Sequence, residues 1–482
     1  MAGAEIHVSA AVSPSTTIPP RPTSPRVVIV GGGLAGMAAG VALQSAGVSV
    51  SLIEARKSLG GRAGSFEDPT TGETLDNCQH VLLGCCTNLI DFYRRIGAGD
   101  RIRWESAIRF ADPNGRTYAL SATALLPAPM HLAPAMAGFG LLTMGERMAV
   151  SRAVLAMLRL GRTGRQQLAD VAFGDWLDRH HQPAGAVQKL YDPVIVSGLN
   201  EETRRASAAY AIKIFQDALL AHRRAYLMGV PNCPLSQLYE RLPIADLRQG
   251  TRVGEIRYRD GAAIGVTLQG GEAIDADAVV LATNYHALEK WVPPELAQRD
   301  SRFSRLGELQ SVPILGVHLW FDRPVLPHSH LALVEGPLQW LFRKDGTGTA
   351  LHGVISAARS WVGVPREEAL PQFEAQVRKV LPAAKEAKLQ RGVVVVEKRA
   401  TFAALPGVDR LRPPQAPPPG GIARLVLAGD YTQTGWPATM EGAVRSGYLA
   451  AEAVLASVGS SNATRIVVPD LPVAWGARAM GM

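Results

Sequence analysis

Residues 27–55 read VVIVGGGLAGMAAGVALQSAGVSVSLIEA. The first four are a β-branched run, which is typical of a buried parallel strand. Gly31–Gly36 then have the spacing Gly-x-Gly-x-x-Gly, and the small apolar residues up to Ser45 predict a helix. A second apolar run, Val48–Ile53, ends at the acid Glu54. Strand, glycine turn, helix, strand and acid in this order predict a dinucleotide-binding unit.

The residue types in this unit also narrow down the nucleotide. Gly33 would let the backbone approach a pyrophosphate, and Gly36 would let the helix pack closely on the sheet. The amides and the dipole at the start of the helix favour an anion. Glu54 lies eighteen residues after Gly36, where an acid can accept hydrogen bonds from a ribose diol. An acid at this place disfavours a 2′-phosphate, so the sequence predicts FAD or NAD rather than NADP.

The composition limits the class of protein. A chain of 482 residues is too long for one core and suits two domains. The net charge is +8, but aromatic residues make up only 6% and no Lys/Arg block alternates with them, so we expect no nucleic-acid partner. The positive charge would instead favour an anionic membrane surface. The four cysteines form no disulfide framework, which fits a reducing cytosol.

The order of apolar runs predicts an α/β fold with two domains. Buried strands are expected in DAVVLATN (277–284) and ARLVLAGD (423–430), far along the chain from the glycine turn. The predicted regions are a disordered leader (1–25), a discontinuous Rossmann-like FAD-binding domain (26–100, 230–290 and 395–458), a mixed α+β substrate-binding domain (101–229 and 291–394) and an irregular tail (459–482).

Leu125–Leu160 is rich in Ala, Met and Leu and carries little charge before Glu146. Its second half predicts a helix. The stretch is either a buried core helix or an apolar channel wall or membrane-contacting surface, and the sequence leaves both interpretations open.

Several motifs together resemble the flavin-containing amine oxidase and phytoene desaturase superfamily. In order they are the glycine turn, GGR (60–62), RVGEI (252–256), ATN (282–284) and AGD…GWPATMEGA (428–443). Two stretches outside the cofactor motifs, YDPVIVSGLN (191–200) and EKRATFAALPG (397–407), resemble most closely the hydroxysqualene dehydroxylases, squalene-associated flavoenzymes of bacterial hopanoid synthesis.

The resemblance implies FAD as the cofactor. It places Arg62 along the pyrophosphate or flavin edge, Val253 at the adenine, and Asp430 at the ribityl chain or phosphate region. The amides of Thr439 and Met440, at the start of a helix, would face the flavin pyrimidine and stabilise negative charge there. Cys78 stands where the superfamily often has glycine. The predicted cofactor-binding residues are Gly31, Gly33, Leu34, Ala35, Gly36, Glu54, Ala55, Gly61, Arg62, Val253, Gly429, Asp430, Thr439 and Met440.

The implied reaction is the reductive dehydroxylation of hydroxysqualene to squalene, which needs an acid for the departing water. The candidate acids are His80, Glu441 and Tyr431. Residue type alone favours the other interpretation of His80, as a satisfied buried histidine. His80 and the nearby cysteines lack the spacing of a metal site, so no metal is expected.

Other functions stay open at this point. The main alternative is a carotenoid desaturase of the phytoene type, which moves electrons in the opposite direction. An amine oxidase fits less well because the second domain suggests an apolar substrate, and a non-catalytic flavin-binding scaffold is a further alternative. The expected partners are an apolar C30 isoprenoid and the inner, cytoplasmic face of the cell membrane. Association with other enzymes of squalene and hopanoid synthesis and the oligomeric state are left open.

Overall fold

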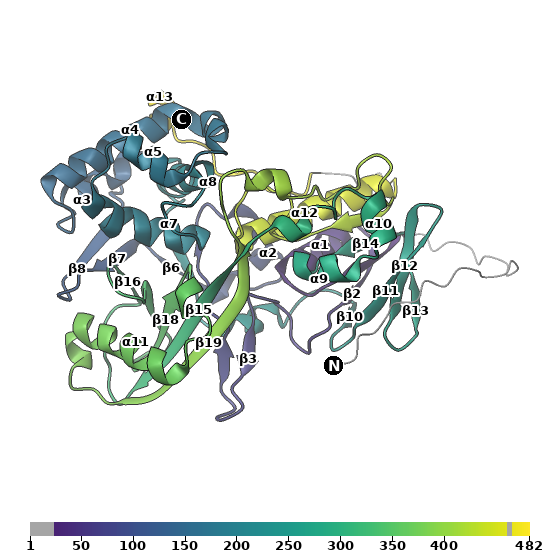
Figure 1. The fold of residues 1–482 in the computed structure, drawn as a ribbon, viewed down its shortest axis with the longest axis horizontal. Helices are drawn as coiled ribbons and strands as arrows, with labels where there is room; N and C mark the ends of the chain where they lie inside the picture. Colours follow the sequence, from purple (N-terminus) through teal and green to yellow (C-terminus); the bar gives the residue numbers. More distant parts are fainter. Residues whose placement is uncertain (1–23, 460–464) are drawn as a thin grey trace, which may run out of the picture.

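The computed structural model describes residues 24–459 and 465–482 (Figure 1). Residues 1–23 of the predicted leader lie outside the described residues. The chain forms two main sheets with helices on and between them, and the predicted α/β fold class is confirmed.

The first sheet is built from segments that are far apart in the sequence. Its five parallel strands lie in the order β10-β2-β1-β14-β20. Their bounds are β1 Arg26–Val30, β2 Ser49–Ile53, β10 Asp246–Arg248, β14 Ala278–Leu281 and β20 Leu425–Leu427. Because the carboxyl ends of parallel strands share one edge, the loops after β1, β2 and β20 meet there.

Two helices pack together against this sheet. They are α1 (Leu34–Ser45), which follows the glycine turn, and α12 (Met440–Ser457), which is the last long helix of the chain. A Cβ atom added to Gly447 would lie 2.2 Å from the carbonyl oxygen of Ala35, so the two helix backbones touch. The small residues of both helices allow this contact, which fixes the N-terminus of α12 beside the glycine turn.

The second sheet has seven strands in the order β19-β15-β18-β17-β16-β7-β8. Their bounds are β7 Ala107–Ala111, β8 Thr117–Ser121, β15 Ser311–Phe321, β16 His330–Leu333, β17 Trp340–Arg343, β18 Ala350–Ile355 and β19 Leu389–Phe402. Helix α11 (Arg366–Val380) buries Phe373 and Val377 in the apolar core beside this sheet. The expected domain boundary at residue 395 falls inside β19, which pairs with β15 along nearly its whole length.

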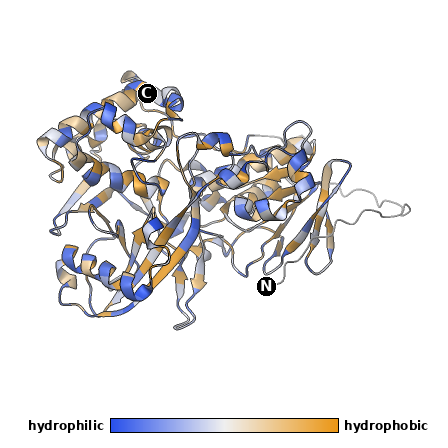
Figure 2. Cartoon of the chain, viewed as in Figure 1, coloured by the Kyte–Doolittle hydropathy of each residue, from blue (hydrophilic) through white to orange (hydrophobic). Residues whose placement is uncertain are grey.

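Helices between residues 133 and 220 form a separate layer at one end of the molecule (Figure 1). They are α3 Ala133–Ala137, α4 Met144–Gly164, α5 Phe173–Arg179, α6 Ala184–Ala186, α7 Asp192–Leu199 and α8 Ala208–Lys213, with two π-helical turns, η4 Val187–Tyr191 and η5 Ile214–Leu220. Helix α4 carries hydrophobic and hydrophilic residues side by side (Figure 2). It buries Val150 and Met157 but exposes Met144 and Met148, so it is a core helix that also presents apolar side chains on its outer side.

Shorter elements connect these layers. Two small sheets are formed by β3 Ser65–Glu67 with β4 Thr74–Asp76, and by β5 Leu82–Leu83, β9 Met228–Pro231 and β6 Ile102–Glu105. An antiparallel sheet of β11 Val253–Arg259, β12 Ala262–Leu268 and β13 Ala273–Asp275 lies beside the parallel sheet (Figure 1). The remaining α-helices are α2 Thr87–Arg95, α9 Tyr285–Trp291, α10 Pro294–Arg299 and α13 Trp475–Ala479.

The C-terminal tail is more ordered than expected. Helix α13 lies within the stretch expected to be irregular, and Ala477 is completely buried. The amide of Ala474 donates to the carbonyl oxygen of Ala221 at 2.8 Å, which attaches the tail to the helical layer. Among the described residues, no helix is both long enough and apolar enough to cross a bilayer.

Candidate functional site

One cavity of about 1020 Å³ connects the edge of the parallel sheet to the helical layer. Its end at the sheet is lined by backbone and charged groups, which include Gly31, Gly33, Glu54, Arg62 and Asp430. Its other end is lined by apolar side chains, which include Val150, Val154, Leu158, Ile214, Phe215 and Leu219. The arrangement therefore offers a polar site that opens into a long apolar chamber.

The glycine turn leaves room for a ligand at Gly33 alone. A Cβ atom on Gly36 would lie 1.9 Å from the carbonyl oxygen of Gly31, and Gly31 itself has a φ of +113°. These two glycines are required by the protein's own packing. A Cβ on Gly33 would meet no protein atom within 4 Å, and Gly33 lines the cavity at the N-terminus of α1, beside Leu34 and Ala35. The open space and the free helix amides fit a pyrophosphate.

Glu54 lies at the carboxyl end of β2, facing the same turn. Its Oε2 accepts a hydrogen bond from the Gly32 amide at 2.6 Å, and its Oε1 accepts one from the Arg56 amide at 2.8 Å. The carboxylate lines the cavity, where a ribose diol could reach it. Two residues predicted to bind the cofactor, Ala55 and Val253, do not line the cavity. Ala55 is exposed, and Val253 begins β11, where it pairs with Leu268.

Arg62 and Asp430 form an ion pair across the sheet edge. The Arg62 Nη2 atom lies 2.6 Å from Asp430 Oδ1, and Nη1 donates to the Ala400 carbonyl oxygen at 2.6 Å. Arg62 and Gly61 come from the loop after β2, and Gly429 and Asp430 from the loop after β20; all four line the cavity. The structure therefore brings these predicted residues together, with the arginine oriented by the acid.

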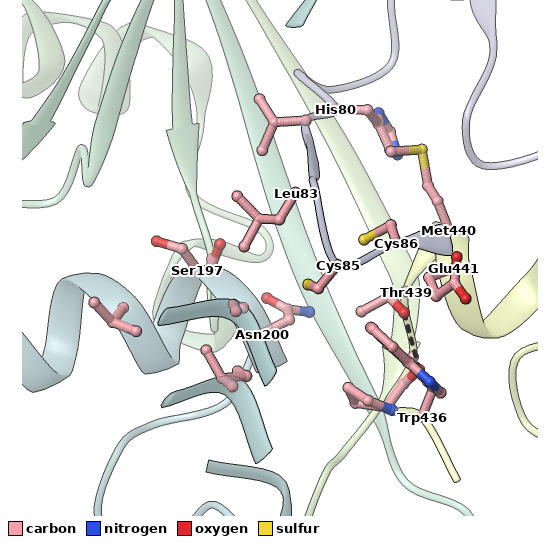
Figure 3. Close-up of a pocket in the computed structure, with 18 of the residues that line it drawn as sticks. His80, Leu83, Cys85, Cys86, Ser197, Asn200, Trp436, Thr439, Met440 and Glu441 are labelled. Atoms are coloured by element: carbon pink, nitrogen blue, oxygen red, sulfur yellow. Dashed lines mark hydrogen bonds between the residues drawn. The ribbon is translucent and has the colours of Figure 1, made fainter. Parts of the chain in front are cut away.

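The N-terminus of α12 completes the polar end of the cavity. Thr439 is the N-cap residue, and its hydroxyl accepts a hydrogen bond from the Gly442 amide at 3.1 Å. Thr439 and Met440 line the cavity on the side opposite Cys85 and Asn200 (Figure 3). The positive end of the helix dipole at this place suits the reduced flavin ring, which carries negative charge.

The three candidate acids occupy very different environments. His80 lines the cavity, and its Nδ1 atom is 2.9 Å from the Cys78 carbonyl oxygen. Burial lowers the pKa of His80, so its ring is neutral at pH 7 and is a weak proton donor there. Figure 3 shows His80 beside Met440, near the start of α12.

Glu441 is completely buried and its carboxylate is already engaged. It accepts hydrogen bonds from the Leu89 amide at 2.8 Å and from Asn88 Nδ2 at 2.9 Å, and Arg445 lies 3.2 Å away. Burial raises the pKa of Glu441, and the Arg445 guanidinium and the α2 amides oppose this shift. Glu441 lines the cavity and stays a candidate acid, and its carboxylate also joins α12 to the start of α2.

Tyr431 does not reach the cavity. Its side chain is 1% exposed and packs against Tyr285, with 5.8 Å between the ring centroids. Its hydroxyl has no hydrogen-bond partner among the described residues. Tyr431 is therefore wrong as a candidate acid, because packing around the loop after β20 turns it into the core.

Lys213 and Asp217 form a charged pair in the cavity wall that sequence reasoning missed. The Lys213 Nζ atom donates to Asp217 Oδ2 at 2.8 Å, and both side chains are almost fully buried. Burial opposes ionisation of Asp217, but Lys213, Arg165 and Arg162 more than offset it and hold its pKa well below its usual value. The signal in the sequence was a Lys and an Asp four residues apart within the apolar run KIFQDALL.

Comparison with known proteins agrees with this geometry. The family model for flavin containing amine oxidoreductases matches residues 34–455. The chain belongs to this family. The FAD-dependent oxidoreductase class and the cofactor FAD are thereby established, and the glycine turn, Glu54 and the α12 N-terminus fit that cofactor.

Within the flavin containing amine oxidoreductases, the chain is similar to carotenoid desaturases. It is 27% identical over 463 residues to the 15-cis-phytoene desaturase of Synechococcus elongatus, with 89% of this chain and 96% of that protein covered. It is also 27% identical over 480 residues to the zeta-carotene desaturase of a Synechocystis strain, covering 90% and 97%. A solved putrescine oxidase shares the fold, with a TM-score of 0.66, 18% identity and coverage of 90% and 99%.

Proposed function

We propose that this protein is an FAD-dependent oxidoreductase that acts on a long isoprenoid chain. The observation that carries this proposal is the single cavity that joins the cofactor site to an apolar chamber. FAD supplies two-electron exchange with a substrate carbon. The side chains of α4, η5 and α7 would hold the isoprenoid and keep water away from the reacting carbon.

Desaturation of a carotenoid precursor is the candidate that the relatives favour. Curated proteins similar to this chain include phytoene and zeta-carotene desaturases, and their alignments span nearly the whole chain. In this reaction the substrate loses two hydrogens and the oxidised cofactor is reduced.

Reductive dehydroxylation of hydroxysqualene is the second candidate. The two stretches that resemble the dehydroxylases both contribute to the cavity wall: residues 191–200 through Pro193, Val194, Ser197, Gly198 and Asn200, and residues 397–407 through Glu397, Arg399, Ala400 and Thr401. Both stretches therefore border the cavity. A charged pair in that cavity, Lys213 with Asp217, also suits a substrate that carries oxygen.

The direction of electron flow distinguishes the two candidates. Oxidised enzyme mixed anaerobically with phytoene should lose its flavin absorbance if it is a desaturase. Chemically reduced enzyme mixed with hydroxysqualene should recover that absorbance and release one squalene per flavin if it is a dehydroxylase. Heat-denatured enzyme with free FAD is the control. If neither substrate exchanges electrons with the flavin, the oxidoreductase proposal fails for both candidates, and a scaffold role is favoured.

We also propose that the enzyme collects its substrate from the cytoplasmic face of a membrane. Leu155 lines the cavity and is 37% exposed, and Met144 and Met148 on the same helix are 64% and 55% exposed. Apolar side chains beside a cavity opening, together with the net charge of +8, suit an anionic lipid surface. Association with other enzymes of isoprenoid synthesis would offer another route of delivery.

Sedimentation with liposomes tests this attachment. The protein should pellet with anionic phosphatidylglycerol vesicles at low salt and less at high salt, because screening weakens the charge attraction. Met144→Ser/Met148→Ser should reduce pelleting at both salt concentrations, whereas Val362→Ser, at an exposed apolar residue near α11, should not. Wild-type protein that stays in the supernatant at every salt concentration would contradict membrane attachment.

A further inference from the structure

The side chain of Lys213 lies almost fully buried in the cavity wall. Its side chain is 7% exposed, and it lines the cavity at the junction between α8 and η5. An ammonium group has three N–H donors. Within the described part of the chain, one hydrogen-bond acceptor contacts Nζ, and that is Asp217 Oδ2 at 2.8 Å. Lys213 therefore keeps donor capacity that this pair does not use.

Trp436 lies directly against this lysine. The Nζ atom is 4.3 Å from the centre of the Trp436 ring, so the ring face stabilises the cation. The indole Nε1 of Trp436 is itself buried and has no acceptor among the described residues. Both residues line the cavity, and Trp436 lies three residues before Thr439, the N-cap of α12. Figure 3 shows Trp436 and Thr439 in the cavity wall. Two neighbouring donors beside the cofactor site thus lack a full set of acceptors.

Asn200 and Ser197, two other polar residues of the cavity lining, differ from this pair because their bonds are made within the protein. Asn200 donates to Thr401 Oγ1 at 2.9 Å and accepts from the Ala357 amide at 2.7 Å. Ser197 donates to the Pro193 carbonyl oxygen at 2.7 Å. A buried donor without an acceptor costs free energy, so the Lys213–Trp436 pair favours a ligand that brings an acceptor oxygen.

We propose that Lys213 and Trp436 donate hydrogen bonds to an alcohol oxygen on the isoprenoid substrate, and that Asp217 and the Trp436 ring hold the ammonium in place. This inference rests on the proposed function and adds the substrate class: an oxygen-bearing isoprenoid, preferred to the hydrocarbon of the same length. A site built to donate to an oxygen rejects the analogue that lacks it, because its donors are then left unpaired.

The test compares binding of hydroxysqualene and squalene to the oxidised, FAD-loaded enzyme. Dissociation constants come from the change in flavin absorbance, with both ligands in the same detergent. The wild type should bind the alcohol about 10- to 100-fold more tightly, because hydrogen bonds to charged groups have this effect. Lys213→Met should bring the ratio of the two constants close to one, and Trp436→Phe should reduce it in part. Differences in detergent partitioning cancel when the ratios of two variants are compared.

The structure offers a matched control and reason to expect a folded variant. In Lys213→Met, Asp217 keeps Arg162 at 2.8 Å and Arg165 at 3.1 Å. Lys189→Met removes another lysine of the helical layer, which pairs with Glu146 at 3.1 Å and is not in the cavity lining. The ratio of the two dissociation constants in Lys189→Met should equal that of the wild type.

Each other outcome overturns the inference. The inference is refuted if the wild type binds the two ligands with equal dissociation constants, or if Lys213→Met leaves the ratio of these constants unchanged. The proposed function is unaffected by either result as long as both ligands bind. Loss of FAD from Lys213→Met, but not from Lys189→Met, would assign the donors to the cofactor. Failure of the FAD-loaded wild type to bind either ligand would refute the proposed function itself.

Discussion

Gly33→Val is expected to remove FAD binding without unfolding the protein. No protein atom lies within 4 Å of a Cβ at this position, and Gly33 has a φ of −75° and a ψ of 176°, which a β-branched residue accepts. The new side chain would instead fill the space beside the α1 amides. Since the pyrophosphate would lose several charge-assisted hydrogen bonds, FAD affinity should fall by more than about 100-fold.

The measurement is the flavin absorbance per protein chain after gel filtration, with circular dichroism as the check on folding. Gly145→Val is the matched control, because Gly145 also has no neighbour within 4 Å of its Cβ but lies exposed near the start of α4. It should retain FAD. A Gly33→Val protein that binds FAD as the wild type does would show that the cofactor lies elsewhere in the cavity.

Glu441→Ala is expected to lower the free energy of unfolding by about 3 kcal/mol, the lower end of the range for breaking a buried charged network. The loss would leave the Leu89 amide without its acceptor, whereas Asn88 Nδ2 would keep the Val468 carbonyl oxygen at 3.1 Å. Arg445 would keep Asp470 as a partner, which is why we expect the lower end. The contact between α12 and the start of α2 would be weakened.

Urea denaturation of the FAD-free form measures this effect without the contribution of cofactor binding. The control is Glu374→Ala, which breaks a partly exposed pair with Arg378 on the surface of α11 and should cost less than about 1 kcal/mol. If Glu441→Ala were as stable as the wild type and yet had lost turnover, the interpretation of Glu441 as an acid would be supported.

Much of the cofactor site follows from local sequence. The β-branched run, the glycine turn and the small-residue helix each depend on neighbours within a few residues, so their periodicity predicts the strand, turn and helix at residues 26–45. The acid after β2 follows in the same way. The motif around Asp430 and Thr439 added the other half of the site, and with it the cofactor FAD, which the family confirms.

The tertiary structure decided the burial and the partners of the polar side chains around the cavity. Tyr431 and Glu441 stand beside cofactor residues in the sequence, yet one is turned into the core and the other is held by Asn88 and Leu89, which are more than 300 residues away in the chain. Lys213 has an ordinary position in an apolar helix, and it becomes a candidate donor only because Trp436 packs against it. A local sequence pattern determines the backbone conformation. The partners and the burial of a side chain depend instead on which distant segments pack beside it.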